Sequence, residues 1–200
     1  MEIKICGIRR EEDIEIINKY KPDYIGFIFA KSKRQITPEK AAQLTEKLAA
    51  GIKTVGVFVN ESYDNIKRAV KIAGLDVVQL HGDEDEEYIR SLNAECELWK
   101  AVRVRDGADI PDVKGVGRIL LDKYTDKEYG GSGTAFDWSS VGSINTDKPL
   151  ILAGGLDENN VQSGIKIFNP VCVDVSSSVE TDGFKDEEKI KNFINAVRND

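Results

Sequence analysis

The sequence contains none of the segments that mark membrane or exported proteins. No apolar run in its 200 residues approaches the roughly 20 residues that a membrane-spanning helix requires. The N-terminal segment MEIKICGIRREED has no apolar core region and no small-residue cleavage site, so it lacks the pattern of a signal peptide. We therefore expect a cytoplasmic protein that has no membrane partner.

Cysteine and histidine are scarce and scattered. The chain has three cysteines that lie far apart, Cys6, Cys96 and Cys172, with no CxxC motif, and it has a single histidine, His81. Zinc sites and disulfide frameworks use such residues at short, regular spacings. The sequence therefore predicts no metal site, and it fits a reducing compartment.

The chain also lacks a basic stripe. Its net charge is −7, and its lysine and arginine residues are spread along the whole length. Surfaces that bind nucleic acid concentrate positive charge, so we expect no nucleic-acid partner. A small anionic ligand remains compatible with this charge, because a few local cations or backbone amides can hold one phosphate.

What the sequence does contain is a regular alternation of short β-branched runs and helix-like segments. Parallel neighbouring strands need crossover connections, so eight strands separated by helices predict a parallel sheet. Eight such units close most naturally into one (β/α)8 TIM barrel, and we expect residues 1–200 to form that single α/β domain. The predicted strands are Ile3–Ile8, Tyr24–Phe29, Val55–Val59, Val77–His81, Leu98–Val104, Arg118–Asp122, Leu150–Ala153 and Val171–Val175.

Capping residues limit the predicted helices. Thr37 and Pro38 are typical of a helix start, and the last helix is expected at about 186–197. Glycine and proline interrupt the pattern between residues 105 and 117, so a poorly formed fifth helix is expected. A doubly wound open sheet is the alternative fold, but its glycines would concentrate in the first strand-to-helix turn. Here the glycine-rich turns follow the sixth and seventh predicted strands.

Polar residues at the carboxyl ends of the predicted strands are the main functional signal. These ends meet at one mouth of a TIM barrel, where its active site lies. Alternation along the first and eighth strands turns Lys4, Cys6 and Asp174 inward, and it allows an interior ion pair between Lys4 and Asp174. The residues expected at the mouth are Cys6, Arg34, His81, Asp122, Asp174 and Ser176.

Each of these residues also has a structural interpretation. Free cysteine is often a small buried hydrophobe, whereas a cation as close as Lys4 would favour a reactive thiolate at Cys6. Asp122 alone could cap the next segment, His81 could be a hydrogen-bonded pocket wall, and Arg34 could be a solvated loop residue.

Turns rich in glycine or serine follow the sixth, seventh and eighth predicted strands. Each turn by itself is weak evidence for a ligand site. Together the three turns put backbone amides where TIM barrels bind phosphate. The expected ligand contacts from these turns are Gly131, Ser132, Gly133, Gly154, Gly155, Ser176 and Ser177. The acidic runs 83–87 and 186–188 are interpreted as first turns of helices and are assigned no function.

Eight segments follow one another in the order found in phosphoribosylanthranilate isomerases: KICGI, GFIFAKSKR, GVFVN, VQLHG, LLD, GGSGTAFDW, LAGGL and DVSS. The chain resembles that family over essentially its whole length, and KICGI together with GGSG-x-x-FDW is the most specific combination. The resemblance implies a TIM barrel that acts in tryptophan biosynthesis. Its reaction is the Amadori rearrangement of N-(5′-phosphoribosyl)anthranilate to 1-(2-carboxyphenylamino)-1-deoxyribulose 5-phosphate.

The resemblance also implies roles for individual residues. Cys6 matches the general base, Asp122 the general acid, and Arg34 the arginine associated with the anthranilate carboxylate. Asp122 would have to hold a proton near neutral pH, which burial favours. The iminium intermediate accepts electrons itself, so no cofactor is expected. The implied partner is a phosphorylated small molecule, and a monomer or a homodimer is expected.

Two positions depart from the family pattern. Lys33 replaces the proline that usually precedes the arginine, and Ser178 replaces the glycine of DVSSGVE. If that glycine has a positive φ, serine adds strain, and if its amide touches phosphate, the side chain crowds the ligand. Ser178→Gly is therefore expected to keep kcat similar and to lower KM.

Three other functions remain open. The histidine-pathway isomerase performs the same rearrangement but typically has an aspartate where this chain has Cys6. Indole-glycerol-phosphate synthase depends on lysines at strand ends, and this sequence matches that pattern poorly. A non-catalytic phosphate-binding barrel fits the changes at Lys33 and Ser178, but it does not account for the presence of both Cys6 and Asp122.

Overall fold

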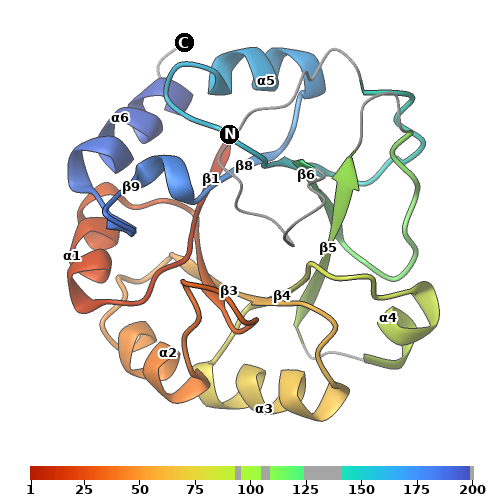
Figure 1. Cartoon of the computed structure of the whole chain (residues 1–200), viewed down its shortest axis with the longest axis horizontal. Helices are drawn as coiled ribbons and strands as arrows, with labels where there is room; N and C mark the ends of the chain where they lie inside the picture. Colours follow the sequence, from red (N-terminus) through yellow and green to blue (C-terminus); the bar gives the residue numbers. More distant parts are fainter. Residues whose placement is uncertain (93–95, 105–108, 124–140, 199–200) are drawn as a thin grey trace.

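The computed structural model describes residues 1–92, 96–104, 109–123 and 141–198, and within them eight parallel strands form a closed barrel (Figure 1). Neighbours pair in chain order, and β8 closes the ring on β1 with Lys4 opposite Asp174. Every strand begins and ends within two residues of its predicted limits, so the predicted TIM barrel is confirmed. The strands are β1 (Glu2–Cys6), β2 (Tyr24–Ile28), β3 (Lys53–Phe58), β4 (Val77–Leu80), β5 (Glu97–Val104), β6 (Arg118–Lys123), β7 (Leu150–Leu152) and β8 (Cys172–Val175).

Helices surround the ring of strands (Figure 1). As predicted, Pro38 is the first residue of α2, and the side chain of Thr37 accepts a hydrogen bond from the amide of Lys40. Residues 109–117, the described part of the connection between β5 and β6, contain no helix, which agrees with the predicted weak fifth helix. The helices are α1 (Glu11–Tyr20), α2 (Pro38–Thr45), α3 (Tyr63–Ala73), α4 (Glu86–Leu92), α5 (Val161–Phe168) and α6 (Glu187–Arg198).

Strand alternation sorts the buried residues into two layers. Outward side chains such as Ile119 and Leu121 on β6 pack with the helices, whereas Leu120 between them lies in the barrel interior. The interior layer comprises Tyr24, Val55, Val77, Trp99, Ala101, Leu120, Ile151, Ala153 and Cys172. This apolar layer closes the lower part of the barrel, so inward polar side chains collect at the carboxyl ends of the strands.

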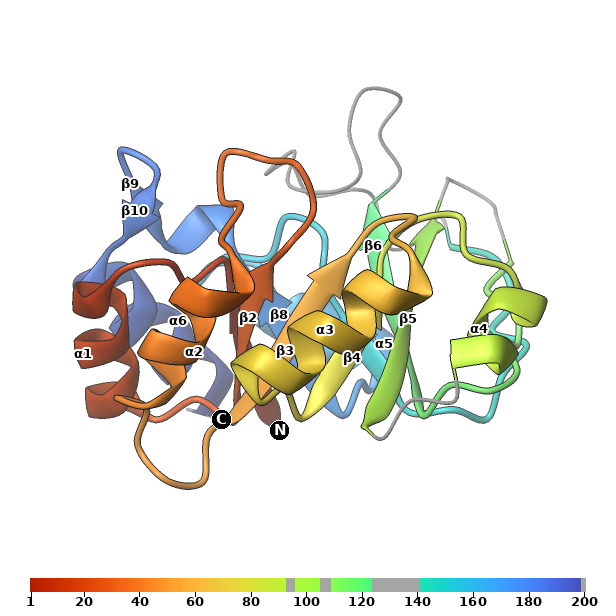
Figure 2. The same cartoon turned by 90° about the horizontal axis from the view of Figure 1, so that it is seen from below.

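A short hairpin stands on the same face as those ends (Figure 2). After β8 the chain forms a 3-10 helix, η2 (Ser177–Val179), and then the strands β9 (Glu180–Thr181) and β10 (Phe184–Lys185). The turn between the two strands is Asp182-Gly183, with φ values of 52° and 79°. Two left-handed residues form the turn that best matches the twist of a hairpin, and Asp-Gly is a preferred sequence for it. The N-terminus and the end of α6 lie at the opposite face (Figure 2).

Candidate active site

Cys6 is the last residue of β1, and its side chain, 6% exposed, faces the barrel interior. Gly26 lies beside it on β2. A Cβ atom on Gly26 would be 2.6 Å from the Cys6 sulfur, which is closer than side chains tolerate, and 3.1 Å from the Cys6 Cα, which is a tight contact. Glycine at this position therefore gives the thiol its space.

Lys4 and Asp174 form the predicted interior ion pair below Cys6. Lys4 is fully buried, and its Nζ donates to Oδ2 of Asp174 at 2.7 Å. The other carboxylate oxygen, Oδ1, is buried and has no hydrogen-bond partner within the part of the chain that the structure describes. Buried polar atoms are normally satisfied, so Oδ1 is a natural acceptor for a ligand hydroxyl.

Burial controls the protonation of this group. It raises the pKa of the Cys6 thiol, and the ammonium groups of Lys4 and Lys185 offset that rise only in part. Lys4 thus acts on Cys6 in the predicted direction but does not outweigh burial. Burial acts to lower the pKa of Lys4, yet Asp174 and Cys6 hold it above its ordinary value, so Lys4 stays an ammonium. Burial also raises the pKa of Asp174.

A second polar chain crosses from β4 to β6. His81 follows β4, and its Nε2 lies 3.0 Å from Oδ2 of Asp122, which is the inward residue near the end of β6. On its other side, Nδ1 of His81 lies 2.9 Å from the amide nitrogen of Gln79. All three side chains are buried. Asp122 therefore interacts with His81 across the mouth, and His81 is hydrogen-bonded on both ring nitrogens, as the interpretation as a hydrogen-bonded pocket wall also expects.

Arg34 is buried at 5% exposure, so the interpretation as a solvated loop residue is wrong. Its Nε and Nη2 donate to the two carboxylate oxygens of Glu180, each at 2.8 Å. Lys185 donates to Glu180 at 2.9 Å, and also to the carbonyl oxygen of Ser176 at 2.9 Å. Gly7, with φ 88°, makes room for Arg34, since a Cβ there would lie 2.8 Å from the arginine Cδ. The hairpin β9–β10 therefore holds the arginine at the mouth.

The turns predicted to bind phosphate lie on adjacent strands. Gly154 and Gly155, after β7, have φ values of 81° and 75°. Ser176 follows β8 and donates its hydroxyl to the carbonyl of Cys6 at 3.0 Å, while Ser177 begins η2. Because β7 and β8 pair, these two turns stand side by side. The predicted contacts Gly131, Ser132 and Gly133 lie outside the described residues.

Ser178 lies in η2 and is not among the described non-glycine residues with positive φ. The condition under which serine would add strain, a positive φ, is therefore not met at Ser178. Its hydroxyl donates to the carbonyl oxygen of Leu156, which joins the turn after β8 to the turn after β7.

Sequence patterns missed a buried ion pair behind the mouth. Glu84, in the acidic run read as a first helical turn, precedes α4 and is 9% exposed. Its carboxylate accepts bonds from the amide of Asn60 at 2.8 Å and from Nζ of Lys100 at 2.9 Å. Lys100 also donates to the carbonyl of Gly82 at 2.7 Å. Glu84 therefore anchors the loop that carries His81. A lysine flanked by apolar residues in the middle of β5 was the available signal.

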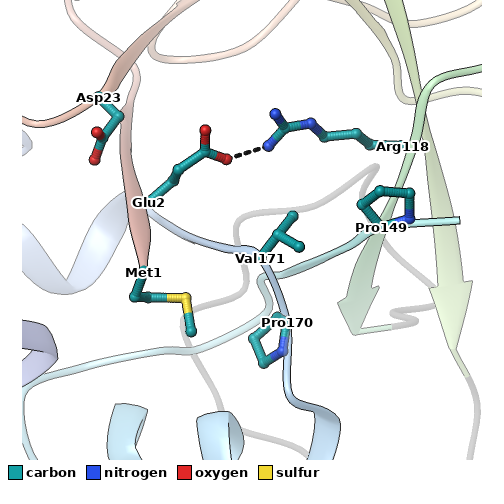
Figure 3. A pocket seen from close by; sticks show the side chains of 7 residues that line it. All are labelled: Met1, Glu2, Asp23, Arg118, Pro149, Pro170 and Val171. Atoms are coloured by element: carbon teal, nitrogen blue, oxygen red, sulfur yellow. Dashed lines mark hydrogen bonds and ion pairs between the residues drawn. The ribbon is translucent and has the colours of Figure 1, made fainter.

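A pocket at the opposite end of the barrel is separate from this site (Figure 3). It is lined by residues at the starts of strands, among them Glu2, Asp23 and Arg118. Glu2 and Arg118 point toward each other and form an ion pair. In TIM barrels this face contributes to stability and the mouth carries the chemistry.

Within residues 1–92, 96–104, 109–123 and 141–198, no group of three or more histidine, cysteine or acidic side chains has an arrangement that could hold a metal ion. In the same residues, no helix has the length and apolar character needed to cross a bilayer.

Comparison with known proteins identifies relatives that match the whole barrel. A curated N-(5′-phosphoribosyl)anthranilate isomerase from Clostridium acetobutylicum is 54% identical over 203 residues, covering 99% of this chain and 98% of that protein. A crystal structure of phosphoribosylanthranilate isomerase in complex with reduced 1-(o-carboxyphenylamino)-1-deoxyribulose 5-phosphate is 33% identical, with a TM-score of 0.78 and coverage of 99% and 98%. Monomers generated from the dimeric enzyme of Thermotoga maritima are 34% identical, with a TM-score of 0.79 and the same coverage.

The family model described as N-(5′-phosphoribosyl)anthranilate (PRA) isomerase matches residues 3–196. That match spans the strands from β1 to β8 and the residues assembled at the mouth. Together with the full-length relatives, it establishes that the chain belongs to the phosphoribosylanthranilate isomerase family.

Proposed function

We propose that the mouth of this barrel binds N-(5′-phosphoribosyl)anthranilate and rearranges it with Asp122 as general acid and Cys6 as general base. The chain is an isomerase of tryptophan biosynthesis by its family. The observation that carries the assignment of roles is that the thiol and the carboxyl group both face inward at the carboxyl ends of their strands, each with its own polar partners.

The first step opens the sugar. Asp122 gives its proton to the ribose ring oxygen, the bond between C1′ and that oxygen breaks, and the lone pair of the anthranilate nitrogen forms the C1′=N bond. His81 holds one carboxyl oxygen of Asp122 at 3.0 Å and so orients the acid. A positioned acid contributes about 10² to 10⁴ to the rate.

The second step removes the C2′ proton. The Cys6 thiolate takes this proton, the electrons of the C2′–H bond form C1′=C2′, and the nitrogen recovers its lone pair. The enolamine then tautomerises to the 2′-ketone. Because the iminium is the electron sink, the residues of the mouth need no cofactor for this chemistry. Lys4 supports the step by stabilising the thiolate that the buried site otherwise disfavours.

The ends of the substrate would be held by opposite parts of the mouth. Arg34, fixed by its two bonds to Glu180, offers a cation for the anthranilate carboxylate. The turns at Gly154–Gly155 and at Ser176–Ser177 offer backbone amides for the phosphate, together with the predicted segment Gly131–Gly133. The Oδ1 of Asp174, which has no hydrogen-bond partner among the described residues, would accept a ribose hydroxyl.

A cytoplasmic location, a single domain over residues 1–200 and a monomeric or homodimeric state belong to the same proposal. The biosynthetic role supports the location, and a dimeric relative makes the homodimer the state to test first. Sedimentation velocity at micromolar concentration separates a monomer from a dimer.

The experiment that tests the activity is the decay of phosphoribosylanthranilate fluorescence after addition of purified protein to freshly made substrate. Decay faster than spontaneous hydrolysis is expected for the wild type. Cys6→Ala and Asp122→Asn are each expected to abolish it, with Cys172→Ala, a cysteine in the apolar layer, as a matched control that retains turnover. Full turnover in either of the first two variants would contradict the role given to that residue.

A further inference from the structure

Gln79 lies behind His81 in the barrel interior. It is 1% exposed and faces inward on β4, opposite Trp99 of β5. Its amide nitrogen lies 2.9 Å from Nδ1 of His81, while its carbonyl oxygen is buried with no hydrogen-bond partner in the described part of the chain. An amide nitrogen only donates, so Nδ1 of His81 must accept.

This contact fixes the tautomer of the imidazole. When Nδ1 accepts, the neutral ring carries its hydrogen on Nε2, which then donates to Oδ2 of Asp122 at 3.0 Å. Rotation of the Gln79 amide by 180° would require the opposite tautomer. A bare Nε2 would then repel Asp122 as a carboxylate, and it would accept the acidic hydrogen of Asp122 as a carboxylic acid and so compete with the ribose ring oxygen for it.

We propose that Gln79 is a positioning residue for the general acid. By holding His81 as the Nε2–H tautomer, it makes Oδ2 of Asp122 a permanent acceptor, so the proton delivered to the ribose ring oxygen is carried on Oδ1. The inference rests on the proposed function, because it concerns the acid of that reaction. It gives the carboxyl group a fixed orientation and a single proton-bearing oxygen, at the cost of one unsatisfied oxygen on Gln79.

Charged groups on the neighbouring elements have partners of their own, among them Arg103 of β5, which is in register with Asp122 and forms an ion pair with Asp83. Asp174 on β8, which interacts electrostatically with both Asp122 and His81, is bonded to Lys4. Lys100 on β5 is bonded to Glu84 beneath the loop after β4. The position of the imidazole hydrogen is therefore set by the neutral amide of Gln79.

The single histidine makes the tautomer directly measurable. In protein labelled with ¹⁵N-histidine, the two ring nitrogens give one pair of resonances, and we expect a protonated Nε2 and a bare Nδ1. Gln79→Glu, whose carboxylate only accepts, is expected to place a hydrogen on Nδ1. Gln43→Leu, at an exposed position of α2, is the matched control and should leave the spectrum unchanged. A protonated Nδ1 in the wild type would overturn the inference.

Kinetics test whether the tautomer matters. We expect Gln79→Glu and Gln79→Leu to lower kcat roughly 10- to 100-fold with KM nearly unchanged, and to move the acid-dependent limb of the kcat profile. His81→Gln keeps an N–H donor but has no tautomer, so adding Gln79→Leu to it should reduce kcat little further. Equal losses in both backgrounds would refute the role. A wild type without isomerase activity would instead contradict the proposed function, whereas the tautomer measurement does not depend on turnover.

Discussion

Replacing Glu180 with glutamine is expected to weaken both the structure of the mouth and the binding of the substrate carboxylate. Glu180 accepts two bonds from Arg34 at 2.8 Å and one from Lys185 at 2.9 Å. The three side chains are at most 7% exposed. Glutamine has nearly the same shape, but it brings an uncharged amide against two buried cations and leaves them to repel each other.

The pKa of Glu180 gives the size of the effect. Burial acts to raise this pKa, but the bonds from Arg34 and Lys185 lower it to about 2 from an ordinary 4.5. By proton linkage this difference corresponds to about 3 kcal/mol of folding stability, less whatever solvent at the open mouth screens. Removing one partner of a buried ion pair costs roughly 3–5 kcal/mol. We expect Glu180→Gln to lose about 2–3 kcal/mol.

The sign of the pH dependence follows from the same values. The folded pKa lies below the unfolded one, so the stabilisation is complete above about pH 4.5 and is lost as the pH falls toward 2. Urea denaturation at pH 7 should show the full difference between wild type and Glu180→Gln, and the difference should shrink as the pH is lowered. Steady-state kinetics should show a higher KM, because Arg34 loses the partner that holds it.

Glu187→Gln is the matched control, since Glu187 is an exposed glutamate that pairs with Lys19. Exposed ion pairs contribute little, so its denaturation midpoint and KM should equal those of the wild type. A Glu180→Gln variant with wild-type stability and wild-type KM would refute the reasoning, because the buried cations would then not need the carboxylate.

Three further changes probe the mouth. Gly26→Ala places a methyl group 2.6 Å from the Cys6 sulfur, and kcat should fall while circular dichroism stays near wild type; an unchanged kcat would contradict the close contact. Ser178→Gly removes the bond to Leu156 and should lower the unfolding free energy by about 1 kcal/mol, with similar kcat and lower KM. An unchanged or higher KM would show that serine does not crowd the ligand. Alkylation of Cys6 by iodoacetamide in a Cys96→Ser background should rise with pH with a midpoint above that of an exposed cysteine thiol, because burial raises the pKa of the Cys6 thiol. A midpoint near neutrality would contradict that cause.

The barrel could be predicted from the sequence because its signals are local and repeated. Each strand is a short run of β-branched residues bounded by turn residues, and the predicted cap at Thr37 stands where α2 starts. Alternation also placed Lys4 opposite Asp174, because adjacent strands of a closed barrel bring their inward residues together. These inferences required only the spacing of apolar residues along each helix or strand and the order of the strands in the chain.

The hairpin after β8 went unrecognised although its turn carries a local signal. Asp182-Gly183 is a preferred sequence for a two-residue hairpin turn, but the flanking strands have only two residues each. Such strands are too short to show an alternating pattern of apolar and polar residues. The hairpin could therefore be identified only in the structure, where Glu180 of β9 contacts Arg34. Whether serine at position 178 would be strained could not be predicted for a related reason, since backbone φ depends on how the turn packs, and here the turn is a 3-10 helix.

Apart from Lys4 and Asp174, the ion pairs of the site were the least predictable part, and the cause is physical. A buried charge needs a partner, and the partner need not be near in sequence: Glu180 is 146 residues from Arg34, and Glu84 is 16 residues from Lys100. Each pair costs desolvation energy, so buried pairs are a poor source of net stability. Their arrangement at the mouth is better explained by chemistry, because fixed charges in a dry site act on a reacting substrate without reorganising. The same buried residues are therefore hard to read from sequence and well suited to catalysis.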